Sequence, residues 1–179
     1  MSARDNKWLI VSEHVVLTSV IEPVIVALDG VFMAANKRGI VTSGLRDQND
    51  QLRIIRDYCV QFGVYKEFPE VMTCKPEEKG GDGLYKWQHA WSRLLNKGLI
   101  INPPYPATVL FDYIRNGVNK KGELIHQSPH FFGRAFDIGG GNDGIDDEDT
   151  LVTPLIGKVL GLVGTLKERN NNCLHCDCV

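Results

Sequence analysis

An apolar repeat with helical spacing is the first regular feature of the chain. Apolar residues recur every three or four positions between Ser19 and about Arg38, which predicts an amphipathic helix ending at Gly39. Ser19 and Glu22 have the spacing of a capping box at the start of this helix. The members of the repeat are Val20, Val24, Leu28, Phe32 and Ala35.

A short strand and a second helix are predicted next. The β-branched run Ile40–Ser43 favours a strand, and Leu52, Ile55 and Cys59 then share one face of a helix. Residues 63–83 mix aromatic residues, prolines and the segment KPEEKGGDG, so we expect an extended loop on the surface.

The rest of the chain alternates helical patterns with polar segments. A third helix is predicted from Leu84 to Asn96, and a fourth after the prolines of NPPYP. The segment from Gly139 to Thr150 is rich in glycine and acidic residues and predicts a solvated loop. A last helix is expected from Pro154 to about Arg169, followed by a buried strand in the terminal CLHCDCV.

Composition narrows the class of protein. With 179 residues, 43% hydrophobic and 23% charged, the chain suits one globular domain spanning residues 1–179. A formal net charge of -2 lacks the basic footprint of nucleic-acid binding, and no run is long enough for a membrane span. The N-terminus lacks the apolar core of a secretory signal, so we expect cytoplasmic synthesis. Five cysteines, an odd number, favour reduced thiols or metal contacts over a disulfide framework.

His130 and Asp137 are candidates for metal ligands. A turn near Gly133 would bring the two ends of the segment His130–Asp137 together, and zinc accepts imidazole and carboxylate ligands. A histidine and an aspartate at this spacing are more often a hydrogen-bonded pair without metal. Spacing alone therefore leaves both interpretations open.

A longer pattern around these two residues adds a family resemblance. The residues Ser128, His130, Gly133, Ala135 and Asp137 stand as S-x-H-x-x-G-x-A-x-D. This pattern resembles the zinc-ligand signature of the D-alanyl-D-alanine carboxypeptidase superfamily. That superfamily includes vancomycin-resistance dipeptidases, phage L-alanyl-D-glutamate endopeptidases and, more remotely, hedgehog signalling domains.

The resemblance implies a full set of zinc ligands. Its first two ligands fall on His130 and Asp137, and its third, a histidine on a later strand, falls on His175 in CLHCD. It also implies an arginine in a segment like S-G-x-R, which is Arg46 in TSGLR. A guanidinium there would hold the substrate and stabilise the developing oxyanion. Ser128 is expected to hold the peptide or carboxylate end of the substrate.

The general base departs from the family pattern. Many members place a glutamate three residues before the last histidine, but that position is Asn172 here, and an amide cannot act as a base. Two carboxylates are candidates: Asp177, which strand alternation puts on the same face as His175, and Glu168 at the end of the last predicted helix. We favour Asp177 as the base. The alternative for Asp177 is an orienting partner of His175.

The C-terminal cysteines allow a rival metal site, a structural zinc knot formed with His175. Strand alternation sends Cys176 and Cys178 to the face opposite His175, which disfavours four converging ligands. Buried cysteines acting as small apolar residues explain the pair more simply, whereas Cys173 shares the face of His175 and stays ambiguous.

The resemblance implies an α+β fold with helices packed on a small, mainly antiparallel sheet that carries the zinc site. It implies a metallopeptidase of the D-Ala-D-Ala carboxypeptidase or endopeptidase type, which hydrolyses D-amino-acid-containing bonds of peptidoglycan. Without a secretion signal, the expected setting is a phage or prophage endolysin released through a holin, or an enzyme carried among phage virion proteins. The alternative, favoured by Asn172, is a non-catalytic zinc-binding virion or wall-binding module of the same fold.

Overall fold

The computed structural model describes residues 2–97, 99, 129–139, 151–168 and 173–178. The chain forms two compact units. The first combines Met1–Arg46 with Phe132–Val179, and the second is Asp47–Phe131. The single domain over residues 1–179 that the sequence suggests stays a prediction.

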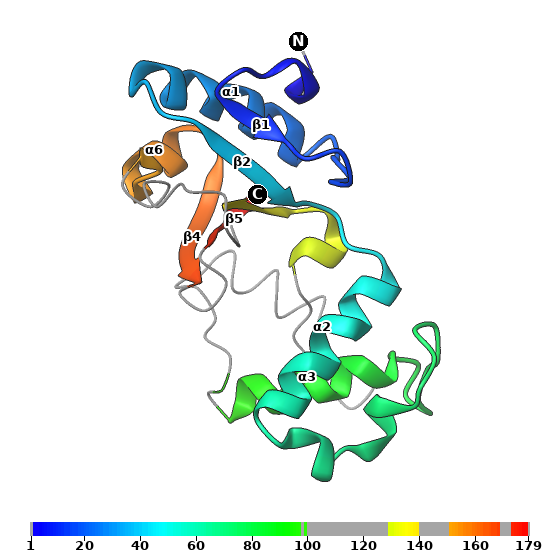
Figure 1. Ribbon diagram of the computed structural model, residues 1–179. Coiled ribbons are helices and arrows are strands. Elements are labelled where there is room, and N and C mark those ends of the chain that lie inside the picture. The colour runs from blue at the N-terminus through cyan, green and yellow to red at the C-terminus, as the bar shows by residue number, and fades with distance from the viewer. Residues whose placement is uncertain (1, 98, 100–128, 140–150, 169–172, 179) are drawn as a thin grey trace. The chain divides into compact units, whose positions relative to one another are not determined.

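The first unit is built on a five-stranded mixed sheet with the strand order β1-β2-β3-β5-β4 (Figure 1). The pair β1–β2 is parallel, and the pairs β2–β3, β3–β5 and β5–β4 are antiparallel. Together with four α-helices in the described part of the chain, this sheet confirms the expected α+β class. The strands are β1 (Leu9–Val11), β2 (Gly39–Ser43), β3 (Ala135–Gly139), β4 (Leu162–Glu168) and β5 (Cys173–Cys178).

Helix α1 (Ile21–Ala34) supplies much of the core of this unit. The predicted residues Val24, Leu28 and Phe32 are buried in one cluster with apolar residues of β3 and β5. The prediction of a capping box formed by Ser19 and Glu22 is wrong, because the N-cap is Val20 and it makes no side-chain cap hydrogen bond. The Thr18 hydroxyl accepts from the amide of Ile21 instead. Glu22 accepts hydrogen bonds from the hydroxyl of Ser2, the N-cap of the 3-10 turn η1 (Ala3–Asp5), and from the amide of Ala3.

The predicted last helix is much shorter than expected. Helix α6 spans only Pro154–Val159, and β4 takes over from Leu162. Gly161 has a φ of +91°, a left-handed conformation that ends the helix at little steric cost. The segment after it pairs with β5 along its length. Its apolar spacing fits either a helix or a strand, and pairing with β5 decides between them.

The second unit contains α2 (Gln48–Gln61) and α3 (Lys86–Asn96). Leu52, Ile55 and Cys59 are all buried in its core, which confirms the predicted helix face. Residues 63–83 are not a continuous loop, since they include the 3-10 turns η2 (Val64–Lys66) and η3 (Pro69–Met72).

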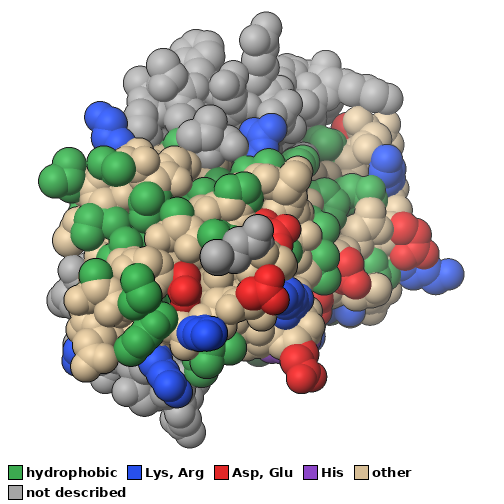
Figure 2. All heavy atoms as spheres, turned by 90° about the horizontal axis from the view of Figure 1, so that it is seen from above, with side chains coloured by type: hydrophobic (Ala, Val, Ile, Leu, Met, Phe, Trp, Pro, Cys, Tyr) green, Lys and Arg blue, Asp and Glu red, His purple; other side chains and the backbone are tan. Residues whose placement is uncertain are grey.

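The predicted fourth helix, after NPPYP, and the acidic segment from residue 140 onward lie outside the described residues. In the described part of the chain, no helix is long and apolar enough to cross a membrane. On the face drawn in Figure 2, apolar side chains at the surface are interspersed with acidic and basic ones. Among the described residues drawn on that face, charges of one sign form no extended patch.

Candidate metal centre

Pairing of β3 with β5 brings together three of the predicted site residues. Asp137 stands directly opposite His175, and Ala135 stands opposite Asp177. Because side chains alternate along a strand, Asp137, His175 and Asp177 share one face of the sheet. Phe136 and Leu174, their neighbours in sequence, belong to the apolar core. The sheet is therefore apolar on one face here and carries ionisable groups on the other.

The approach of His130 depends on a tight turn before β3. His130 lies in the 3-10 turn η4 (Pro129–Phe132), and Gly133 follows with a φ of +64°. The Thr18 hydroxyl donates a hydrogen bond of 2.7 Å to the carbonyl oxygen of Gly133. The expected turn near Gly133 is thus present, and Thr18 anchors it.

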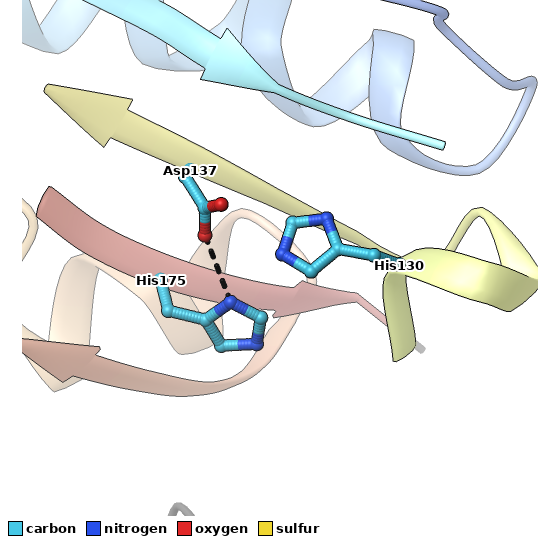
Figure 3. Close-up of side chains that lie close together, drawn as sticks. All are labelled: His130, Asp137 and His175. Carbon is cyan, nitrogen blue, oxygen red and sulfur yellow. Dashed lines mark hydrogen bonds and ion pairs between the residues drawn. The ribbon is translucent and has the colours of Figure 1, made fainter. Parts of the chain in front are cut away.

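The three predicted ligands form one buried cluster. Potential ligand atoms of His130, Asp137 and His175 all lie within 4.8 Å of one another, and the side chains point toward one another (Figure 3). Their exposed fractions are 1%, 4% and 7%, respectively. Two imidazoles and one carboxylate are a donor set that fits a catalytic zinc ion, which uses three protein ligands and leaves a further position for water. This cluster could hold a metal ion.

His175 lies between two carboxylates. Its Nδ1 is 2.9 Å from Oδ1 of Asp137, and its Nε2 is 3.0 Å from Oδ1 of Asp177. Burial alone would lower the pKa of His175, but the hydrogen bonds and negative charges of Asp137 and Asp177 raise that pKa to about 10. Without a metal, this geometry therefore favours a protonated imidazole held by both acids.

Arg46 contacts the metal-binding cluster itself. Its Nη2 lies 2.8 Å from Oδ2 of Asp137, and its Nε donates a hydrogen bond of 3.1 Å to the Ser43 hydroxyl. The two oxygens of Asp137 thus have different partners, His175 at Oδ1 and Arg46 at Oδ2. The Arg46 side chain is 21% exposed, so it is half-buried rather than free at the surface.

The remaining predicted site residues are described to different extents. Asp177 is 1% exposed, and its Oδ2 is buried with no hydrogen-bond partner among the described residues. Glu168 ends β4, where its backbone pairs with Cys173, but its side chain lies outside the described part of the structure. Ser128 and Asn172 also lie outside the described residues.

The C-terminal cysteines do not join the cluster. Cys176 and Cys178 belong to the apolar core, on the face opposite His175, as strand alternation predicts. Burial raises the pKa of the Cys178 thiol to about 12 and that of Cys176 well above its usual range. Among the described residues, the potential metal-binding group contains no cysteine. This geometry favours the interpretation of buried thiols over the zinc knot.

Two residues near the site were missed at the sequence level. Ser43 belongs to the TSGLR segment that identified Arg46 as a candidate, so the motif already contained an indication that Ser43 lies near the site. Thr18 lies 115 residues before Gly133, and no local pattern connects the two.

Comparisons with known proteins do not add a relative. No family model, curated protein or solved structure matches this chain. The functional argument therefore depends on the chemistry of the cluster and on the sequence pattern that led to it.

Proposed function

We propose that this protein is a zinc-dependent peptidase of the D-alanyl-D-alanine carboxypeptidase superfamily, which hydrolyses D-amino-acid-containing bonds of peptidoglycan. The observation that carries the proposal is the buried cluster of His130, Asp137 and His175. These residues are the ones that the pattern S-x-H-x-x-G-x-A-x-D and the terminal histidine single out in the sequence. The sequence pattern and the spatial cluster select the same three residues, and this agreement supports a shared role in metal binding.

His130, Asp137 and His175 would hold the metal. Zinc held by two imidazoles and one carboxylate would lower the pKa of a coordinated water and polarise a carbonyl oxygen. Arg46 holds Oδ2 of Asp137, and His175 contacts Oδ1. Oδ1 is therefore the oxygen that faces the cluster. Asp137 would therefore offer a single oxygen to the metal.

Arg46 would also act on the substrate. Among the described residues, its Nε and Nη2 have partners, so Nη1 would be the nitrogen that holds a substrate carbonyl or carboxylate. Ser128 would bind the peptide or carboxylate end of the substrate, and Asp177 and Glu168 are the candidate proton acceptors. A phage or prophage origin, with release through a holin or carriage in a virion, is the setting that we propose.

Hydrolysis of purified peptidoglycan tests the proposal. The full chain, purified without added metal and then loaded with zinc, should release peptides detectable by mass spectrometry. Release should stop with a chelator and return when zinc is added back. Asp137→Ala should abolish both zinc binding and release, and Arg38→Ala, at an exposed position, should change neither.

The outcomes separate the enzyme from its alternative. Zinc retention and sedimentation with peptidoglycan, without any peptide release, would favour a non-catalytic wall-binding or virion module. A protein that cannot be loaded with zinc would overturn both proposals.

A further inference from the structure

We infer that Asp177 is a positioning residue, which accepts a hydrogen bond from Nε2 of His175 and so presents Nδ1 of the same ring to the metal. This inference rests on the metal site of the proposed function. It changes the role of Asp177, since the sequence pattern favours this carboxylate as the general base.

The first step concerns which nitrogen faces the cluster. Nδ1 of His175 lies 2.9 Å from Oδ1 of Asp137, itself one of the three potential ligands. In Figure 3 this nitrogen is the one joined to Asp137 by the dashed line. Nε2 lies 3.0 Å from Asp177, which does not belong to the group of ligand atoms within 4.8 Å of one another. A metal shared with His130 and Asp137 would therefore bind His175 through Nδ1.

The second step follows from the protonation of the ring. A neutral imidazole that gives the lone pair of Nδ1 to a metal carries its proton on Nε2. That N–H needs an acceptor, because His175 is buried. Oδ1 of Asp177 is at hydrogen-bond distance and comes from the same strand, two residues along. Such carboxylate–histidine–metal arrangements fix the tautomer and the orientation of the ring.

The third step separates positioning from proton transfer. The two nitrogens of an imidazole point away from each other, so a carboxylate on Nε2 lies on the opposite side of the ring from a metal on Nδ1. Oδ1 of Asp177 is engaged by Nε2, and the whole side chain is 1% exposed. A general base must reach the metal-bound water within hydrogen-bond distance. Asp177 is placed behind the ligand instead, which leaves Glu168 as the remaining candidate base.

The experiment compares Asp177→Asn with Asp177→Ala in the full chain. The amide oxygen of asparagine still accepts a hydrogen bond from Nε2, but it has no basicity. We expect Asp177→Asn to keep zinc affinity and turnover within about tenfold of wild type, and Asp177→Ala to lose roughly 10- to 100-fold in zinc affinity. Zinc affinity is measured by competition with a chromophoric chelator, and turnover by peptide release from peptidoglycan.

A nuclear magnetic resonance measurement keeps the test independent of the alanine variant, which removes a buried side chain and threatens folding. Long-range ¹H–¹⁵N spectra of the histidine rings in the wild-type protein, with zinc, should show His175 bound through Nδ1 and protonated at Nε2. Zinc on Nε2 would overturn the inference. A loss of turnover of a hundredfold or more in Asp177→Asn, with zinc retained, would also overturn the inference. Asp177 would then be the general base, as the sequence pattern favours.

Failure of the proposed function gives a different result. Zinc bound through Nδ1 without hydrolysis of peptidoglycan would refute the peptidase and leave the positioning role intact, because affinity and spectra do not depend on turnover. Absence of zinc binding would refute both.

Discussion

Nη2 of Arg46 lies 2.8 Å from Oδ2 of Asp137, whereas Nδ1 of His175 lies 2.9 Å from Oδ1 of the same carboxylate. This ion pair links the arginine of the TSGLR segment to a predicted metal ligand. Arg46 is therefore in a position to orient the carboxylate as well as to contact a substrate. The sequence predicted the second role and contained no indication of the first.

Replacement of Arg46 by alanine should affect the metal, the activity and the stability together. Asp137 is buried, so Arg46→Ala removes a charged hydrogen-bond partner from a desolvated carboxylate. We expect Arg46→Ala to weaken zinc binding and to lower turnover by about a hundredfold. The cost in unfolding free energy of the metal-free protein should be about 1–3 kcal/mol, above the small change expected for a surface residue. Chelator competition, peptide release and thermal unfolding measure these effects.

Ser43→Ala tests the other contact of Arg46, because Ser43 holds the guanidinium that contacts Asp137. The Ser43 hydroxyl accepts from Nε of Arg46, so its loss should loosen the guanidinium and reproduce the zinc defect in weaker form. Arg38→Ala is a suitable control for removal of a positive charge from an exposed position. Normal zinc affinity in both Arg46→Ala and Ser43→Ala, with reduced turnover only, would show that Arg46 acts on the substrate alone.

Features that depend on neighbouring residues were predictable from the sequence. The turn at Gly133 and the alternation of side chains along β5 follow from local backbone geometry. The first predicts that His130 approaches Asp137, and the second predicts that His175 and Asp177 share one face of the strand. The register of β3 on β5 was not predictable, because it joins Asp137 to a residue 38 positions later. Only the family resemblance connected the two.

Tertiary pairing explains the features that were missed. The segment Leu162–Glu168 has an apolar pattern that fits a helix, yet it forms a strand because β5 offers it a partner. The run Leu9–Val11 is too short to be recognised alone, and it becomes β1 through its parallel pairing with β2. Glu22 looked like half of a capping box, but it receives hydrogen bonds from the N-terminal turn.

The raised pKa of His175 predicts a pH dependence of stability without metal. The folded pKa of about 10 lies above the ordinary value of 6.5, so the proton on His175 stabilises the folded state. This contribution is fully present below about pH 6.5 and is lost as the pH rises toward 10. Chemical denaturation of the chelator-treated protein across this range should show a falling unfolding free energy.

Zinc-loaded protein is the matched comparison for this measurement. A metal on His175 replaces the proton, so the decline attributable to His175 should disappear. Other groups titrate in both samples, and the difference between the two curves isolates the site. Equal slopes with and without zinc would contradict either the raised pKa or the binding of metal at His175.

The cysteines of β5 should be dispensable for the metal. Cys176 is buried in the apolar core, opposite His175. Cys176→Ala should therefore keep full zinc occupancy and cost about 1 kcal/mol of stability, as is common for a small change in packing. Elemental analysis and thermal unfolding provide the test. A stoichiometric loss of zinc in a folded Cys176→Ala protein would revive the zinc knot.

Gly133 should be needed for the approach of His130 to Asp137. Its φ of +64° is unfavourable for other residues, and a Cβ there would lie 2.5 Å from Cγ2 of Thr18. Gly133→Ala should lower both stability and zinc affinity, with a backbone cost of about 1–3 kcal/mol. Gly63→Ala is the control, because Gly63 has a φ of +70° but a Cβ at that position would meet no atom within 4 Å. Thr18→Ser removes the clashing methyl group and keeps the hydroxyl, so it should partly rescue Gly133→Ala. Equal zinc affinity in Gly133→Ala and wild type would show that the turn does not position the ligands.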